Sequence, residues 1–419
     1  MRMIVRIIIA VTTLALGPVA LAEDAPSSPP ATAPAAAPAS APATQDDVRA
    51  HAEELRRLKL EIGLRDVEYQ SYGGLGPAAS KVYFAPKGLS IGGYGEVVYA
   101  NQLDRRGDTS DMFRLVLYVG YRFTDRLVFN SEVEYEHGGV ETAVEFAYLD
   151  YRFSDALQVR VGNVLVPVGM VNELHEPPFF HGVFRPDLER NLIPATWNEN
   201  GVGLHGQVGP VRYQAYLLNG LDASDNTLSE GSWLRNARTG GSESRAETVA
   251  GVLALSIDLG PATVGGSVYR GRAGQGEAGV DADVTLAEAH GRLAWRGLGV
   301  KAIYAVGTLS DAAALTASGV LGSRVRGGYL EASYDVMRLV SAGSDASVEP
   351  FLRYQAYDLN DQVPDGLTAS PAAEVTTWTA GVTFKPVSTV VFKADWQRRE
   401  TAAPGSAADQ VNVGAGFVF

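Results

Sequence analysis

Apolar and polar residues alternate along most of the chain from residue 89 onward. In FRLVLYVGYRF, residues 113–123, apolar side chains occupy every second position, and Arg114, Tyr118 and Arg122 are among the residues between them. A period of two places successive side chains on opposite faces of a β-strand. The pattern therefore predicts strands that have one apolar face and one polar face.

Sixteen segments share this alternation. We expect strands near residues 89–100, 111–123, 127–137, 142–153, 157–168, 200–208, 211–219, 247–258, 262–271, 283–295, 298–308, 326–338, 347–358, 375–385, 389–398 and 410–419. Short connections such as 124–125 and 209–210 alternate along the chain with long ones such as 220–246 and 308–324. An even number of antiparallel strands, with short turns on one rim and long loops on the other, is typical of bacterial β-barrels.

The polar faces of these strands carry too many charges for a dry protein core. After the first 22 residues, no apolar stretch reaches the ~20 residues that a membrane helix needs. Without such helices, only a closed barrel satisfies the backbone polar groups in lipid. We therefore predict an all-β fold: a transmembrane antiparallel β-barrel of about 16 strands over residues 89–419, preceded by a short N-terminal helix. A barrel of this size should hold an aqueous channel.

The first 22 residues have the organisation of an export signal. Arg2 and Arg6 precede an apolar run from Ile7 to Leu16, and Ala20-Leu21-Ala22 provides a cleavage site of small residues. We interpret residues 1–22 as a signal peptide, and the alternative is an uncleaved anchor. Export is therefore expected.

The last strand indicates which membrane contains the barrel. It alternates through QVNVGAGFVF and ends on Phe419. A terminal aromatic residue on an alternating final strand is typical of outer-membrane barrels. With the signal peptide, it predicts a multi-pass barrel in the outer membrane of a Gram-negative bacterium, with the N-terminus in the periplasm.

Two further segments separate the signal peptide from the barrel. Residues 23–44 are rich in Pro and Ala and are expected to form a disordered spacer. In residues 45–68, apolar residues recur at helical intervals, and acids precede bases, which suits the helix dipole. We expect a periplasmic helix here. It either forms a coiled coil that helps to build a homotrimer or is a simple surface helix.

Composition limits the possible chemistry and partners. The chain has no cysteine, so thiolate chemistry and disulfides are excluded. The formal net charge is −13 and no Lys/Arg cluster stands out, which argues against nucleic acid as a partner. We expect no cofactor, and we expect outer-membrane lipid and small hydrophilic solutes or ions as partners.

One long segment interrupts the alternation. Residues 173–200, ELHEPPFFHGVFRPDLERNLIPATWNEN, suit neither a helix nor a strand, and they follow the fifth predicted strand. They belong to the third external loop, about 169–199, which we expect to fold into the barrel and narrow the channel, because prolines stiffen it and aromatic residues can pack on the wall. The candidate constriction residues are Glu173, His175, Glu176, Phe179, Phe180, His181, Arg185, Asp187, Glu189, Arg190, Trp197 and Glu199. Five acids against two arginines make this loop acidic.

The charged residues on the polar faces of the strands are candidates for the pore wall. They are Arg114, Arg122, Arg152, Arg160, Arg212, Arg292, Arg353, Glu132, Glu134, Glu136, Glu145 and Asp150. Both signs are interspersed, which suits hydrophilic solutes generally. For any single residue the alternative is a pair with a neighbouring strand. We expect selectivity to come from the width of the third loop and from the field between its acids and the arginines of the wall.

A metal site and a hydrolase site are the chemical alternatives to this channel. His175, Glu176 and His181 could hold a metal, but their spacing across two prolines matches no common ligand pattern. A hydrolase would need a nucleophile and a base at the rim. No Gly-x-Ser-x-Gly elbow accompanies the isolated histidines elsewhere in the chain. The sequence therefore predicts neither a metal site nor an enzyme.

Three motifs resemble a known family of barrels. GGYGEVVY (92–99), RVGNVLVPVGMVNE (160–173) and RNLIPATWNENGVGL (190–204) are similar to segments of the phosphate-selective porin O/P type. In that family an Arg-x-Gly strand runs into a Pro-x-Gly turn before the third loop, and relatives carry an N-terminal coiled coil. The resemblance implies a porin, with uptake of phosphate or polyphosphate along a ladder of basic residues.

Taken together, the residues predict an outer-membrane porin for passive diffusion of small hydrophilic solutes or ions. Only six lysines occur in the chain and the third loop is acidic, so an anion- or phosphate-selective porin is the alternative. A non-conducting structural or adhesive barrel is the second alternative.

Overall fold

The computed structural model describes residues 70–103, 107–224, 228–277, 280–341 and 344–419. All of them belong to one compact unit, Asp66–Phe419. The predicted signal peptide, spacer and helix, residues 1–68, lie outside the described residues.

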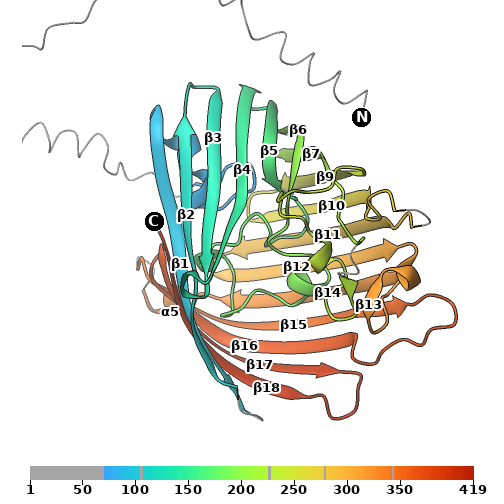
Figure 1. The fold of residues 1–419 in the computed structure, drawn as a ribbon. Coiled ribbons are helices and arrows are strands. Elements are labelled where there is room, and N and C mark those ends of the chain that lie inside the picture. Colours follow the sequence, from blue (N-terminus) through green and yellow to red (C-terminus); the bar gives the residue numbers. More distant parts are fainter. Residues whose placement is uncertain (1–69, 104–106, 225–227, 278–279, 342–343) are drawn as a thin grey trace, which may run out of the picture. The chain divides into compact units, whose positions relative to one another are not determined.

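Sixteen antiparallel strands of the described chain close into a barrel, in which β1 (Gly88–Gln102) pairs with β18 (Ala408–Val418) (Figure 1). The others are β2 (Thr109–Arg122), β3 (Leu127–Glu136), β4 (Glu141–Ser154), β5 (Leu157–Leu165), β6 (Asn198–Val208), β7 (Val211–Asn219), β9 (Val249–Asp258), β10 (Ala262–Arg272), β11 (Asp283–Trp295), β12 (Leu298–Leu309), β14 (Arg324–Tyr334), β15 (Ser347–Gln362), β16 (Glu374–Val387) and β17 (Val390–Thr401). The predicted fold class and strand number are confirmed.

Several short elements are not part of the barrel wall. β8 (Leu228–Ser229) and β13 (Thr316–Ser318) form a parallel pair between two loops. The helical elements are α3 (Pro77–Phe84), η1 (His137–Gly139), η2 (Pro177–Phe179), α4 (Leu188–Asn191), η3 (Arg235–Ala237), η4 (Ala312–Ala314) and α5 (Met337–Val340). No helix in the described ranges has the length and apolar composition that a membrane crossing requires.

Two strand ends differ from the prediction for local reasons. The strand expected to reach residue 168 ends at Leu165, because Pro167 has no N–H for the ladder. The strand expected to reach residue 338 ends at Tyr334. There the Asp335 carboxylate accepts hydrogen bonds from the backbone N–H groups of Met337 and Val348, at 3.1 and 3.3 Å, and starts a turn.

The barrel has two unlike ends. The end that carries the short connections 155–156, 209–210 and 388–389 also carries Phe419, and we name it the turn end. The opposite end carries the long connections, including the third loop (166–197) and the fourth loop (220–248), and we name it the loop end.

Alternate side chains face outward and inward as the period of two requires. Outward residues such as Ile91 and Leu253 are 52% and 49% exposed, whereas inward Glu132 and Arg353 are 0% and 2% exposed. Apolar residues therefore cover the outside, and charged residues fill the inside, which is the arrangement of a barrel in lipid.

The outer face gives a testable prediction. We expect Leu253→Arg, near the middle of β9, to destabilise the folded barrel in bilayers by roughly 2–4 kcal/mol, because the charge would face hydrocarbon. Unfolding in urea, followed by the heat-modifiable gel mobility of barrels, measures the difference. Gln397→Arg, which faces the interior, is the matched control, and equal costs for the two variants would contradict an outward Leu253.

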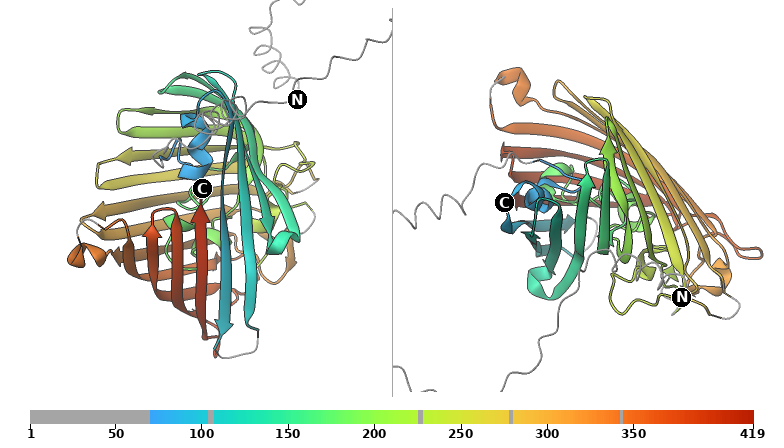
Figure 2. Two further views of the ribbon diagram at one scale, coloured as in Figure 1. Left: turned by 90° about the vertical axis from the view of Figure 1, so that its left-hand side faces the viewer. Right: turned by 90° about the horizontal axis from the view of Figure 1, so that it is seen from above.

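The helix α3 lies inside the barrel and was not predicted, because the sequence analysis assigned no element between residues 69 and 88. It packs on the inner face of β1, β2 and β3 (Figure 2). Ala78 and Val82 are buried there. A Cβ on Gly120 would lie 2.6 Å from Val82 Cγ2, and a Cβ on Gly92 would lie 2.9 Å from the Ala78 carbonyl oxygen. Glycines in the wall thus make room for the helix.

Candidate functional site

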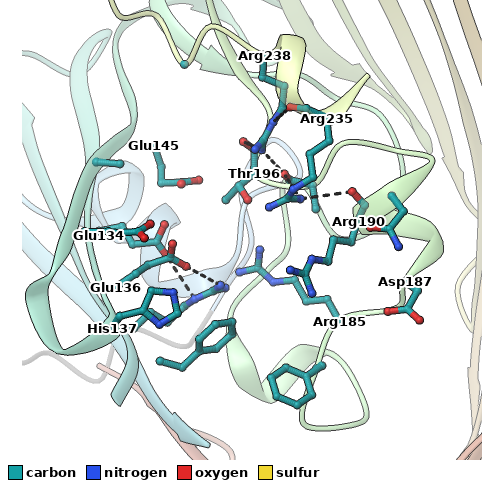
Figure 3. Close-up of a pocket in the computed structure, with 18 of the residues that line it drawn as sticks. Glu134, Glu136, His137, Glu145, Arg185, Asp187, Arg190, Thr196, Arg235 and Arg238 are labelled. Atoms are coloured by element: carbon teal, nitrogen blue, oxygen red, sulfur yellow. Dashed lines mark hydrogen bonds and ion pairs between the residues drawn. The ribbon is translucent and has the colours of Figure 1, made fainter. Parts of the chain in front are cut away.

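A cavity of about 970 Å³ opens inside the loop end of the barrel. Its lining comes from strands β1 to β4, the third loop with the first residue of β6, the fourth loop, and the pair β17 and β18. Because these parts are far apart in sequence, only closure of the barrel brings them together. Figure 3 shows Glu134, Glu136 and Glu145 on one side of the cavity, and Arg185, Arg190, Arg235 and Arg238, together with Asp187, on the other.

The strands β2 to β4 form the acidic side. Arg114 of β2 lies at its centre, and its guanidinium is 3.4 Å from Glu96, 3.2 Å from Glu134 and 2.9 Å from Glu136. Glu145 of β4 lines the same side. One arginine therefore faces four carboxyl groups, so this wall attracts positive charge.

The third and fourth loops form the basic side with Arg185, Arg190, Arg235 and Arg238. Backbone carbonyls hold the last two: Arg235 Nη1 donates to the Arg190 oxygen at 3.3 Å, and Arg238 Nε donates to the Arg235 oxygen at 2.7 Å. Within the part of the chain that the structure describes, no Asp or Glu forms an ion pair with any of the four. The four guanidinium groups line the cavity, where a solute can reach them.

The arginines also repel one another. Burial and the positive charges of Arg238, Arg190 and Arg185 lower the pKa of Arg235 to about 10. An anionic group entering between them would relieve this repulsion and form hydrogen bonds with the planar guanidinium groups. The basic side therefore suits carboxylate or phosphate groups, and the acidic side opposite suits cationic groups.

The third loop, predicted to fold into the barrel, crosses its interior to the opposite wall. His181 lies 2.8 Å from Glu331 of β14 and 3.0 Å from Glu349 of β15. Lys301 Nζ of β12 donates to the Phe179 carbonyl at 3.1 Å, and the N–H of Val183 donates to Asp395 of β17 at 2.6 Å. Charged side chains of four strands thus anchor the tip of this loop.

Four of the five acids of this segment do not line the cavity, whereas the sequence predicted an acidic constriction. Glu176 accepts hydrogen bonds from the N–H groups of Ala78 and Ala79 at 3.0 and 3.1 Å, and Glu189 accepts from those of Met170 and Val171, both at 2.7 Å. Burial raises the pKa of Glu176 to about 7 and raises that of Glu189 as well. The reason is that a long irregular loop inside a barrel leaves backbone N–H groups without partners, and carboxylates supply the acceptors.

Two more acids of the segment also accept hydrogen bonds inside the barrel. Glu173 accepts a hydrogen bond from Gln214 Nε2 at 2.8 Å, and Glu199 accepts one from the N–H of Thr239 at 3.1 Å. Asp187 does line the cavity, 3.9 Å from Arg399. The field across the cavity therefore runs from loop arginines to wall acids, the reverse of the predicted polarity.

The aromatic and histidine candidates of the loop also pack inside. Trp197 is fully buried, with its ring centroid 4.7 Å from that of Tyr269. Phe179 and Phe180 line a cavity of about 20 Å³ beside β12 to β15. His175 Nε2 lies 3.0 Å from Glu132 Oε1. These residues hold the loop rather than face the large cavity.

The predicted pore-wall residues fall into separate groups. Arg114, Glu134, Glu136 and Glu145 line the large cavity. Arg212 and Arg292 line a second cavity of about 50 Å³ near Glu173. The remaining six lie elsewhere in the barrel interior: Arg122, Arg152, Arg160 and Asp150 near α3 and its flanks, Glu132 beside the third loop, and Arg353 beneath its tip.

Sequence reasoning missed Arg235, Arg238 and Arg399. The first two lie three residues apart in the fourth loop, and η3 turns both toward the cavity. No periodicity marks a loop that bends into a lumen, so the sequence contains no signal for them beyond their charge.

One polar cluster outside the large cavity contains a serine, a glutamate and a histidine, but not in the order of a catalytic triad. Ser267 Oγ donates to Glu288 Oε1 at 2.8 Å, and Glu288 Oε2 lies 2.8 Å from His290 Nδ1. The carboxylate stands between serine and histidine, so this histidine does not take the serine proton. Among the described residues, Glu136, His137 and Glu141 lie close enough to hold a cation, but His137 Nδ1 already lies 2.6 Å from Asp111.

The sequence is 40% identical over 366 residues to an uncharacterised protein of Aquifex aeolicus (strain VF5), covering 82% of this chain and 83% of that protein. The chain belongs to the family of that protein. No model of a described protein family matches the chain.

Solved structures of other proteins share the fold of this chain. Its barrel is similar to OmpF of Salmonella typhi in complex with daunomycin (TM-score 0.53, 12% identity, 79% of this chain and 97% of that chain). It is also similar to the trimer form of OmpT of Vibrio cholerae (TM-score 0.52, 13% identity, 80% and 100%). The chain therefore has a porin-like sixteen-stranded barrel.

Proposed function

We propose that the protein is an outer-membrane channel for passive diffusion of small hydrophilic solutes. The observation that carries the proposal is the cavity of about 970 Å³, lined by opposed charges, inside a barrel whose outer face is apolar. A structural barrel has no need to gather four arginines around one cavity, because their mutual repulsion costs stability.

The orientation follows from the same proposal. The loop end faces the outside of the cell, and the turn end, with Phe419, faces the periplasm, as the export signal and final strand predict. A homotrimer is part of the proposal too, and its support is the fold shared with OmpT, which has been solved in a trimer form.

The opposed charges suggest a preference among solutes. A field across the cavity turns a dipolar solute so that its anionic group meets the loop arginines and its cationic group meets Glu134 and Glu145. We therefore infer that zwitterions such as amino acids pass more readily than neutral sugars of the same size.

Proteoliposome swelling tests the channel. Purified barrels should let zwitterionic and neutral solutes of small size enter, with faster swelling for the zwitterions, and should give stable current steps in planar bilayers. Folded protein that gives neither, even in the unlatched variant described below, would contradict a channel. Equal swelling rates for both solute classes would contradict the proposed preference.

An anion-selective channel is the second candidate. Its support is the set of four loop arginines without carboxylate partners, together with the resemblance to phosphate-selective porins. The reversal potential in a KCl gradient separates the candidates: a strong chloride preference favours the second, and a potential near zero favours general diffusion.

A further inference from the structure

We propose that residues 70–85, here named the plug, form a built-in gate that closes the turn end of the channel and opens it by leaving the barrel. The plug contains α3 and the residues before it. This inference goes beyond diffusion through the cavity, because it assigns a closed state to the protein and a moving part that ends that state.

The plug is attached to the inner wall by hydrogen bonds along its length. Tyr83 Oη donates to Asp150 Oδ2 at 2.8 Å, and Asn130 Nδ2 donates to the Ala79 carbonyl at 2.9 Å. At its end, Arg122 Nη1 donates to the Ala85 carbonyl at 2.8 Å. These partners come from β4, β3 and β2, so one face of the plug is complementary to the wall.

The residues before the helix cross to the next strands. Tyr72 Oη donates to Gln158 Oε1 of β5 at 2.6 Å. Gln214 Nε2 of β7 donates to the Gly73 carbonyl at 2.6 Å. The plug therefore spans the interior from β2 to β7.

The third loop meets the plug through the buried carboxylate of Glu176, and Glu173 also lies against Gly74. Glu176 is 1% exposed, and its Oε1 accepts both N–H bonds at the start of α3, from Ala78 and Ala79. These N–H groups have no partner within the helix and lie at the positive end of its dipole. Gly76 leaves the space for this carboxylate, since a Cβ there would lie 2.2 Å from Oε1. We name this contact the latch.

The third loop lines both cavities of the barrel interior, and the plug lines the smaller one through Gly74. The cavity of about 970 Å³ at the loop end and the cavity of about 50 Å³ beside Arg212 and Glu173 share no lining residue. The loop tip is anchored on β12 to β17 by buried ion pairs, and the plug is held by the latch and by the wall contacts already described. Among the described residues, the plug has no ion pair to the wall, unlike the loop tip, and the proposal therefore assigns the movement to the plug.

The backbone on both sides of α3 is suited to such movement. Gly73 and Gly74 adopt φ of 62° and 100°, and Gly88 at the start of β1 adopts φ of 115°. Glycine takes these conformations without strain and changes them easily. A helix of eight residues is marginal by itself, so the plug needs its contacts to stay folded and leaves as an extended chain.

A reversible disulfide across the latch tests the gate. In Gly76→Cys/Glu176→Cys, the Cβ of residue 76 would lie 2.9 Å from the position of Glu176 Cγ, and the Cβ of residue 176 is one bond from that Cγ, so the two Cβ atoms lie no further apart than the roughly 3.5–4.5 Å that a disulfide spans. The chain has no other cysteine. Oxidation therefore locks the plug, and reduction leaves the same molecule without its latch.

We expect reduction to raise the ratio of open to closed time in planar bilayers by roughly tenfold or more, because two buried hydrogen bonds to a carboxylate are missing. Oxidised protein should stay closed, and reductant should leave the wild type unchanged. Equal currents from the oxidised and reduced double variant, with the disulfide verified by mass spectrometry, would overturn the gate while leaving the channel in place.

A second measurement does not depend on current. Val82→Cys places a thiol on the buried face of α3. In the wild type the Val82 residue is 2% exposed. A membrane-impermeant maleimide should label it at least several times faster when Glu176→Ala is added, whereas Glu176→Gln, which keeps an acceptor oxygen, should have a smaller effect. Faster labelling without any current would mean that the plug moves but the protein is not a channel. Unchanged labelling would overturn the gate.

Discussion

Replacing Arg353 by Met is expected to destabilise the barrel by roughly 3–5 kcal/mol, because a buried carboxylate would lose its main counter-charge. Arg353 is 2% exposed, and its Nε donates to Glu331 Oε2 at 2.7 Å. Its Nη2 donates to the His181 carbonyl at 2.6 Å. The side chain thus joins β15, β14 and the tip of the third loop. Urea unfolding in lipid vesicles measures the loss.

The surroundings of Glu331, the partner of Arg353, explain why the loss of stability should be large. Glu331 also lies 2.8 Å from His181 and 3.5 Å from Lys301, and it is as buried as Arg353. Removing one charge leaves the others in a site with little water. The double variant Arg353→Met/Glu331→Gln should therefore recover part of the stability, since both members of the pair are replaced.

A surface pair serves as the matched control. Arg326 lies 2.7 Å from Asp361, but its side chain is 53% exposed. We expect Arg326→Met to change stability by about 0–1 kcal/mol, because water screens such pairs. If Arg353→Met cost no more than Arg326→Met, the anchor of the third loop would not be the buried cluster.

Neutralising the four loop arginines is expected to move the ion preference of the channel strongly toward cations. The variant carries Gln at positions 185, 190, 235 and 238. It leaves the carboxylates of β2 to β4 facing the cavity with Arg114 as their principal counter-charge. The reversal potential in a tenfold KCl gradient should then shift by tens of millivolts toward the potassium potential, because the remaining field attracts cations.

Two controls separate this effect from a general loss of charge. Arg245 also belongs to the fourth loop, but it is about half exposed and pairs with Asp222 at 3.8 Å, so Arg245→Gln should leave the reversal potential unchanged. Glu134→Gln/Glu145→Gln should shift the potential in the opposite direction. A four-arginine variant with wild-type selectivity would show that solutes do not pass between the two charged sides.

The strands could be predicted from the sequence because their signal is local. Alternation places Leu253 outward and Arg114 inward without any knowledge of their neighbours, since a strand has a period of two. Sixteen strands and the asymmetry of their connections then place residues 166–197 as the third long loop. The fold class and the position of this loop follow from the order of residues alone.

The polarity of the cavity could not be predicted in this way. The charges of the third loop can be counted from the sequence, but the count does not say which of them face water. Glu176 turned out to serve the N–H groups of α3, 98 residues earlier in the chain. Arg235 entered the cavity from a different loop. Loop residues are placed by partners distant in sequence, and a single sequence does not pair them.

The sequence by itself determined the barrel, its strand order and the segment that interrupts it, because these depend on a period that each strand repeats. The tertiary structure alone decided that α3 lies inside, that Glu176 holds it, and that four arginines and one acid, Asp187, face the cavity from the third and fourth loops. The physical reason is that buried backbone groups of irregular segments need hydrogen-bond partners. Only the folded chain determines which carboxylates satisfy them and which charges remain for a solute.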